Sequence, residues 1–288
     1  MPPRTALLDT SAFKALSRNS LLAAMENGWH LTTSPWCFFE LLCHLDEEPD
    51  FAKARGHLMK FRGLEIVDKP LDRAVATSQQ SSDARIWSSD LAYAALGAID
   101  AAGSLDDLNR SLIVDEAGNK RDVKGCVDRI RQRLEEEESR FRQVIAEVIK
   151  LIRAGQVPRS TAEERHHAIL DMVASGGSAL ADTPDLDYGA SATNEEILRY
   201  SYAYWAYAFL RAVAQADAGG STCGKNDFED GQLCAYVPLD EPMWVIADDR
   251  PLLSTLSATR EILVDVGMAE RAAFKPAKPD MLLQGGPS

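Results

Sequence analysis

The stretch that decides the fold is Leu7–Phe13, which reads LLDTSAF. The residues from Thr5 to Leu8 are mostly apolar, and a short run of this kind predicts a buried strand. Asp9 ends the run, so its carboxylate is expected at the C-terminal edge of a parallel sheet. In open α/β sheets this edge is where ligands bind. The stretch therefore predicts a buried strand and a functional site at the end of that strand.

Working outward from Asp9, the first seventy residues alternate between strand and helix signals. Ser34 is a good N-cap, and Pro35 suits the first position of the helix that it opens. Alternation of this kind predicts a parallel sheet covered by helices. The expected elements are a strand at Thr5–Leu8, a helix over Ser11–Asn27, a strand at Leu31–Thr33, the helix after Ser34, and a strand at Leu64–Val67.

The same alternation returns near the end of the chain. Asp249 directly follows the apolar run at Met243–Ala247, as Asp9 follows the first strand. The tail after Phe274 is rich in Pro and Gly and is expected to be loose. The expected elements are a helix opened by Asp230 through Val237, a strand at Met243–Ala247, a helix over Leu252–Ala258, and a strand at Ile262–Asp265.

The middle of the chain shows no comparable strand signal. Apolar residues spaced seven apart predict one long helix over Val123–Ala154, and Asn194–Ala216 predicts another whose aromatic residues pack inside the protein. The predicted fold class is therefore α/β, a three-layer α/β/α sandwich with a mainly parallel sheet. Residues 1–68 and 224–288 are expected to form the sheet domain, and residues 69–223 a large all-helical insertion.

Composition limits the classes of function. The chain has 288 residues and a net charge of −13, which argues against broad nonspecific binding to nucleic acid. Its five cysteines form no CxxC pair, so disulfides and a zinc site are not expected. The most apolar segment, Tyr200–Leu210, is far shorter than the ~20 residues that cross a bilayer. A cytoplasmic protein without a membrane partner is expected.

Four acidic residues lie where strands end or helices begin: Asp9, Glu40, Asp230 and Asp249. Carboxylates gathered in one crevice repel each other unless a cation neutralises them, and hard cations such as Mg²⁺ or Mn²⁺ prefer oxygen ligands. The pattern therefore predicts a metal site. Each residue also has a plainer interpretation, because Asp9 can cap a helix, Asp230 can favour a helix dipole, and Asp249 can belong to a turn.

Together these signals resemble the PIN domain family of metal-dependent nucleases. The matching features are LLDTSAF, a Glu on the helix after the second strand, an Asp opening the helix before the fourth strand, and Asp249 followed by Arg250 and Leu252. The family commonly has Thr where this chain has Ala247, and many members lack a long insertion. The resemblance covers about Thr5 to Asp68 and Lys225 to Val266.

The resemblance implies a ribonuclease that hydrolyses RNA phosphodiester bonds with Mg²⁺ or Mn²⁺. Asp9, Glu40 and Asp249 would be metal ligands, with Asp230 a ligand or a base that orients water; Asp227 and Glu229 lie in the same stretch and leave that assignment open. Thr10 and Ser11 are expected to hydrogen-bond the Asp9 carboxylate, and Asp248 to assist. The basic residues assigned to substrate contact, against the alternative of a solvated surface, are Arg55, Lys60, Arg62 and Arg250.

Several questions stay open at this level. Relatives include toxins held by an inhibitory protein partner and enzymes of RNA maturation, and the sequence does not decide between them or show whether the chain forms a homodimer. One alternative is a catalytically inactive PIN-like scaffold that binds partners through its insertion. Another is a phosphatase of the haloacid dehalogenase type, but that class needs a second Asp where this chain has Ser11.

Overall fold

The computed structural model describes residues 4–47, 50–71, 88–114, 118, 120–181, 194–224 and 226–284. Its centre is a five-stranded sheet in the order β3-β2-β1-β6-β7, in which every neighbouring pair is parallel. The strands are β1 (Arg4–Leu8), β2 (Trp29–Thr33), β3 (Glu65–Ile66), β6 (Trp244–Ile246) and β7 (Lys275–Ala277). The sheet is thus assembled from both ends of the chain, as the sequence predicts.

The helices that follow β1 and β2 lead to β2 and β3 on one side of β1, whereas α13 leads from β6 to β7 on the other. Parallel connections are almost always right-handed, so these two groups are expected on opposite faces of the sheet. The arrangement is compatible with a three-layer α/β/α sandwich. The helices are α1 (Thr10–Ala15), α2 (Arg18–Glu26), α3 (Pro35–Cys43), α4 (Phe51–Leu58) with the short η1 (Met59–Phe61), and α13 (Arg250–Asp265).

Several predicted features of the sheet domain were wrong. The helix expected over Ser11–Asn27 is broken, because Leu16 is extended and Ser17 caps a new helix by accepting a hydrogen bond from the amide of Ser20 at 3.0 Å. Residues 262–265 are not a strand but the last turn of α13. The segment after Phe274, expected to be loose, contains β7 and η3 (Pro279–Leu282), and η2 (Ala269–Arg271) lies just before it.

The segment between β3 and α12 (Asp227–Cys234) is mainly helical. It contains α6 (Ser89–Ala101), α7 (Leu105–Arg110), α8 (Val123–Arg153), α9 (Ala162–Ala181) and α11 (Asn194–Asp217). The prediction of an all-helical insertion was wrong, because β4 (Leu112–Val114) and β5 (Lys120–Asp122) form an antiparallel pair. These strands lack the long apolar runs of the main sheet, so their sequence gives little strand signal.

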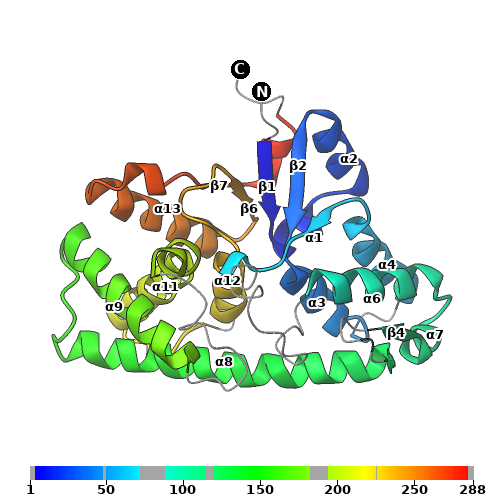
Figure 1. The fold of residues 1–288 in the computed structure, drawn as a ribbon, viewed down its shortest axis with the longest axis horizontal. Coiled ribbons are helices and arrows are strands. Elements are labelled where there is room, and N and C mark those ends of the chain that lie inside the picture. Colours follow the sequence, from blue (N-terminus) through cyan, green and yellow to red (C-terminus); the bar gives the residue numbers. More distant parts are fainter. Residues whose placement is uncertain are drawn as a thin grey trace.

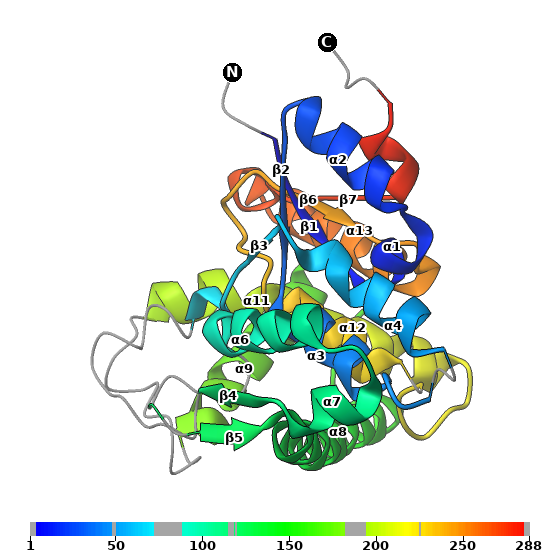
Figure 2. The ribbon, with the colours of Figure 1, turned by 90° about the vertical axis from the view of Figure 1, so that its right-hand side faces the viewer.

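Figure 1 shows β1, β2, β6 and β7 and both chain ends in the upper half of the molecule, with α8 running along the bottom. Figure 2 views α8 nearly end-on, with α7 above it, α6 higher up, and the β4–β5 pair at the left of α8. The carboxyl ends of β1 and β2 lead into α1 and α3, and α3 and α12 both contact α8. The insertion therefore lies at the edge of the sheet where the acidic residues were expected.

The predicted packing role of the aromatic helix is confirmed. On α11, the side chains of Tyr202, Tyr207 and Phe209 are fully or almost fully buried, and the helix contacts α8, α9, α12 and α13. All five cysteines are free, as predicted. Across the described part of the chain, no helix is long and apolar enough to cross a membrane.

Candidate active site

Asp9 leaves the sheet and starts α1 at the same time. Its amide donates to the carbonyl of Ile246 at 2.9 Å, which continues the β1–β6 pairing by one residue. Its carboxylate caps α1, because Oδ2 accepts hydrogen bonds from the amide of Ser11 at 2.9 Å and from the Ser11 hydroxyl at 2.5 Å. Only 9% of Asp9 is exposed. The carboxylate is thus fixed in a buried position at the strand exit.

Ser11 connects two of the predicted acidic segments. While its hydroxyl donates to Asp9, its oxygen accepts a hydrogen bond from the backbone amide of Asp248 at 2.8 Å. Asp248 itself is exposed, and Asp249 next to it is half-buried. Asp249 caps α13 by accepting a hydrogen bond from the amide of Leu252 through Oδ1 at 2.8 Å. Ser11 therefore links Asp9, at the end of β1, to the segment after β6 that carries Asp249.

Glu40 is joined to the same place through Thr10. Thr10 Oγ1 donates to Glu40 Oε2 at 2.6 Å, so its hydroxyl binds Glu40 and not Asp9 as expected from the sequence. Ser34 starts α3 as predicted, by accepting a hydrogen bond from the amide of Cys37 at 3.1 Å. This start places Glu40 in the second turn of the helix. Consecutive residues of α1 thus hold Glu40 and Asp9.

Asp230 lies in the first turn of α12 and is buried. The helix starts at Asp227, three residues earlier than expected. The hydroxyl of Tyr207, on α11, donates to Asp230 Oδ2 at 2.9 Å and lies 3.3 Å from Asp227 Oδ1. Arg211 neutralises Asp227 in an ion pair at 2.7 Å, so Asp227 has a structural partner that Asp230 lacks. The insertion therefore supplies a direct contact to a predicted site residue.

Burial and mutual repulsion raise the pKa values of these carboxyl groups. Burial, followed by the charge of Glu229, raises the pKa of Glu40 to about 7. Burial, followed by the charge of Asp249, raises the pKa of Asp230 to about 8. Burial is also the main cause of the raised pKa of Asp9, which the nearby Asp249 raises further. The hydrogen bonds of Thr10 and Ser11 link the segments that carry Asp9, Glu40 and Asp249, and the charges of Asp9 and Asp249 both raise the pKa of Asp230.

Glu229 is a fifth carboxylate in this group, named in the sequence only as an alternative to Asp230. It is half-buried, and burial raises its pKa, with smaller contributions from Glu138 and Asp9. Its charge is also the largest electrostatic influence on the pKa of Glu40. Its place one residue before Asp230 on α12 was the only sequence signal for it. We call Asp9, Glu40, Glu229, Asp230 and Asp249 the acidic cluster.

The donor set of the acidic cluster fits a hard divalent cation. Among the residues that the structure describes, none of its five members forms an ion pair with Lys or Arg. The charges of His44 and then Lys14 lower the pKa of Glu229 against the larger effect of burial, and the charge of Lys14 lowers that of Glu40. Buried carboxylates without a counter-charge favour proton or cation binding. Within the described ranges, no three acidic, His or Cys side chains are already arranged to hold a metal ion. Ligation would therefore require side-chain rotation.

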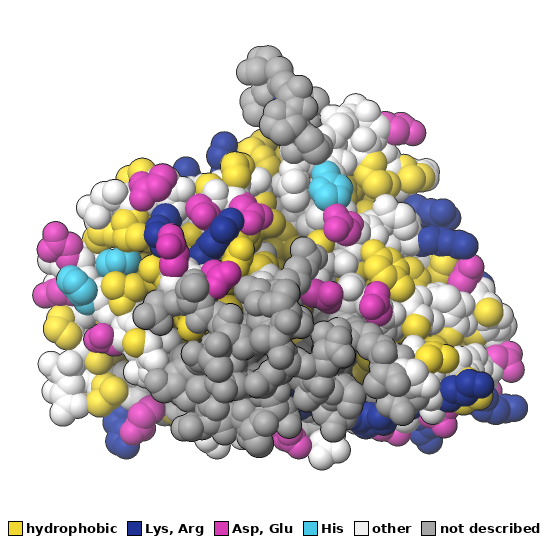
Figure 3. All heavy atoms as spheres, in the orientation of Figure 1, with side chains coloured by type: hydrophobic (Ala, Val, Ile, Leu, Met, Phe, Trp, Pro, Cys, Tyr) yellow, Lys and Arg dark blue, Asp and Glu magenta, His cyan; other side chains and the backbone are white. Residues whose placement is uncertain are grey.

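Three of the four predicted basic residues lie on or beside α4 and η1, and Arg250 lies next to Asp249 at the start of α13. Lys60 donates through Nζ to the carbonyls of Phe13 and Leu16, at 2.6 and 2.8 Å, and so holds η1 against the end of α1. Arg55 and Arg62 both pair with Asp100 at the end of α6. Arg250 is exposed in the first turn of α13. Figure 3 shows Lys and Arg side chains together on the right-hand side, where α2 and α4 lie in Figure 1.

No protein-family model, curated protein or solved structure matches the chain at a significant level.

Proposed function

We propose that the chain is a Mg²⁺- or Mn²⁺-dependent ribonuclease with a PIN-like core, which hydrolyses phosphodiester bonds at the acidic cluster. The observation that carries the proposal is the burial of several carboxylates, with raised pKa values and no ion pair to Lys or Arg in the described residues, at the C-terminal edge of a parallel sheet. Sites of this kind are unstable as isolated anions and are stabilised by binding a cation.

Each residue has a distinct task in this proposal. Asp9, Glu40 and Asp249 would hold the cation. A bound divalent ion lowers the pKa of coordinated water and neutralises charge that develops on phosphate oxygens. Ser11 and Thr10 fix the orientations of Asp9 and Glu40 through their hydroxyl groups. Such partners of ligating carboxylates commonly tune metal affinity.

Asp230 is suited to orient the attacking water. Tyr207 donates to its Oδ2, which fixes the carboxyl plane and leaves Oδ1 to accept a hydrogen bond from water. Its raised pKa, at about 8, means that the group holds its proton more firmly than an ordinary aspartate in the absence of a cation. A neighbouring positive charge would lower this pKa and convert the group into a base.

The proposal is tested by incubating the purified chain with labelled single-stranded RNA, with Mn²⁺ or with EDTA. We expect cleavage only with Mn²⁺, and none from Asp9→Asn. Asn is as good an N-cap as Asp, so α1 and the circular dichroism spectrum should be unchanged. Asp50→Asn is the matched control, because Asp50 also caps a helix, α4, through its carboxylate, is exposed, and does not belong to the acidic cluster.

Cleavage by Asp9→Asn at the rate of the unmodified chain would refute the assignment of the site. Absence of cleavage by the unmodified chain, together with no Mn²⁺-dependent thermal shift, would instead favour the second candidate, a PIN-like scaffold without activity. Ala247 favours that candidate, because it is fully buried beside the acidic cluster and cannot donate the hydrogen bond of a threonine. In that case the insertion would be the binding surface.

A further inference from the structure

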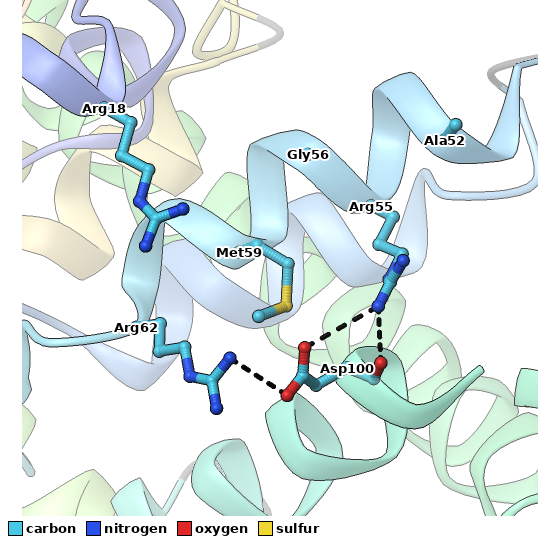
Figure 4. A pocket seen from close by; sticks show the side chains of 7 residues that line it. All are labelled: Arg18, Ala52, Arg55, Gly56, Met59, Arg62 and Asp100. Atoms are coloured by element: carbon cyan, nitrogen blue, oxygen red, sulfur yellow. Dashed lines mark hydrogen bonds and ion pairs between the residues drawn. The ribbon is translucent and has the colours of Figure 1, made fainter. Parts of the chain in front are cut away.

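A basic pocket lies between α2, α4 and α6, apart from the acidic cluster. It has a volume of about 260 Å³. Figure 4 shows Met59 at its centre, with Arg18 and Arg62 extending from one side and Arg55 from the other. We call the cavity lined by Arg18, Arg55, Met59, Arg62 and Asp100 the arginine pocket. Three arginines but only one acidic residue therefore line this cavity, on a chain whose net charge is −13.

Part of this positive charge has a structural use. Arg55 donates through Nε to the carbonyl of Ile99 at 2.9 Å, and its Nη2 binds the carbonyl of Asp100 and lies 3.6 Å from the carboxylate. These bonds satisfy carbonyls at the C-terminal end of α6, which have no partners inside the helix. Arg55 thus closes α6 against α4 and neutralises part of the charge of Asp100.

Arg18 and most of Arg62 remain available. Arg62 contacts Asp100 through Nη1 at 3.0 Å, and 62% of its side chain is exposed. Among the described residues, the side chain of Arg18 has no hydrogen-bond or ion-pair partner, and the residue is exposed. A guanidinium group presents five N–H donors in a planar fork that matches the oxygens of a phosphate. The guanidinium groups of Arg18 and Arg62 therefore line one cavity, and they have N–H donors that no described protein group accepts.

We propose that the arginine pocket binds a phosphate group of single-stranded RNA, with Arg18 and Arg62 as its donors. This inference rests on the proposed ribonuclease function and adds a substrate contact remote from the cleavage site. Arg18 was not among the basic residues predicted from the sequence, whereas Lys60, which was, bonds the end of α1 and does not line the pocket. Because bidentate contacts of Arg to phosphate are charge-assisted, they are stronger than neutral hydrogen bonds.

In the chain, the short helix α1 separates the acidic cluster from the first residue of the arginine pocket. Asp9 caps the start of α1, and Arg18 begins α2 three residues after α1 ends. From the rise of a helix and the reach of an extended chain, their Cα atoms are at most about 25 Å apart. Lys60 bonds the end of α1 and stands next to Met59 in the pocket wall. One RNA strand can therefore reach both places.

The test is binding of labelled single-stranded RNA of about 12 nucleotides, within the site sizes known for single-strand binders. It is measured by fluorescence anisotropy in EDTA with Asp9→Asn protein, so that no cleavage occurs. In this background we expect Arg18→Gln and Arg62→Gln each to weaken binding about tenfold, as loss of a charge-assisted hydrogen bond does. Arg62→Gln leaves Asp100 paired with Arg55. Lys150→Gln, an exposed cation near the C-terminal end of α8, is the control for net charge.

The salt dependence separates a phosphate contact from a structural role. Each lost contact should reduce the slope of log K against log salt by about 0.7 for a single strand. Oligonucleotides with a 5′-phosphate or a 5′-hydroxyl distinguish a terminal phosphate from a backbone phosphate, and both results support the pocket. Unchanged affinity and slope in the folded double variant, or an equal loss in Lys150→Gln, would overturn it. If the arginine variants lose RNA binding but the unmodified chain never cleaves RNA, the pocket is upheld and the nuclease function is refuted.

Discussion

At the scale of single residues, burial sets the chemistry of Glu40. Its neighbours Phe38, Phe39 and Leu42 are buried, and only Thr10 offers a hydrogen bond to the carboxylate from the described side chains. The pKa of Glu40 is raised from 4.5 to about 7, chiefly by burial and then by the charge of Glu229. Close to neutral pH, Glu40 therefore exchanges between a protonated form and a form that can bind a cation.

The raised pKa predicts the direction in which pH changes the stability of the metal-free protein. The folded state binds the Glu40 proton more tightly than the unfolded state, so this contribution to stability is complete below pH 4.5 and is lost as pH rises through 7. Glu40→Gln keeps an acceptor for Thr10 but does not titrate. Relative to the unmodified chain, we expect this variant to gain on the order of 2 kcal/mol of unfolding free energy between pH 4.5 and pH 8.

The measurement is urea unfolding in EDTA across that pH range, with Glu26→Gln as the control, because Glu26 is exposed at the end of α2. A constant difference between Glu40→Gln and the unmodified chain across the range would contradict a raised pKa. With Mn²⁺ present, Glu40→Gln should have the smaller unfolding free energy, because the unmodified chain would be stabilised by a ligand that Glu40→Gln holds less well.

At the scale of elements, short isolated apolar runs in the sequence predicted the strands correctly. The prediction failed where an apolar run could be a strand or part of a helix, and where a strand has no apolar run. Residues 262–265 are apolar enough for a strand, yet Ile262 and Leu263 are buried on one face of α13. A run of four residues cannot distinguish these cases. β7 was missed because it contains Pro276 and two flanking polar or small residues; as the edge strand it tolerates a proline.

The candidate site was predictable as far as it depends on strand exits and helix starts. Asp9, Glu40 and Asp249 could be named because each has a local signal of this kind. Tyr207 could not, because it lies 23 residues before Asp230 and their contact depends on how α11 packs against α12. Aromatic residues surround that helix, and their spacing does not show which hydroxyl reaches a carboxylate.

The Tyr207 contact gives a prediction for α11. Tyr207→Phe keeps the packing of a fully buried ring but removes the donor to Asp230. Because partners of metal-site carboxylates commonly affect affinity 10–100-fold, we expect Mn²⁺ to bind about tenfold more weakly. Isothermal titration at pH 8 measures this affinity.

Tyr202→Phe is the matched control for that experiment. Tyr202 is equally buried on the same helix, and its hydroxyl contacts His166 at 2.8 Å, away from the acidic cluster. We expect both variants to lose about 1 kcal/mol of unfolding free energy, as loss of one buried hydrogen bond does. Only Tyr207→Phe should lose Mn²⁺ affinity; equal losses in both variants would show that helix stability, and not the contact to Asp230, controls binding.

At the scale of the whole molecule, the insertion and the sheet domain share their packing. Phe141 of α8 lies 5.7 Å from Phe228 of α12 between ring centroids, and Phe228 in turn packs against Trp36 of α3 at 5.3 Å. Gly231 allows this approach, because a Cβ atom at its position would meet the Phe141 ring at 3.3 Å. One continuous set of apolar contacts therefore runs from the long helix of the insertion into the helices that hold the acidic cluster.

This continuity predicts that the sheet domain does not fold without the insertion. Replacing residues 70–223 by a short Gly-Ser linker would expose Phe228 and the faces of α12 and α13 that α11 covers. Each large apolar side chain returned to water costs about 2–3 kcal/mol, and a domain has only about 5–15 kcal/mol of stability in total. We expect the shortened chain to show no cooperative thermal transition by circular dichroism and no Mn²⁺-dependent shift. A sharp transition, with Mn²⁺ binding retained, would show that the sheet domain positions its carboxylates alone and that the contact of Tyr207 with Asp230 is dispensable.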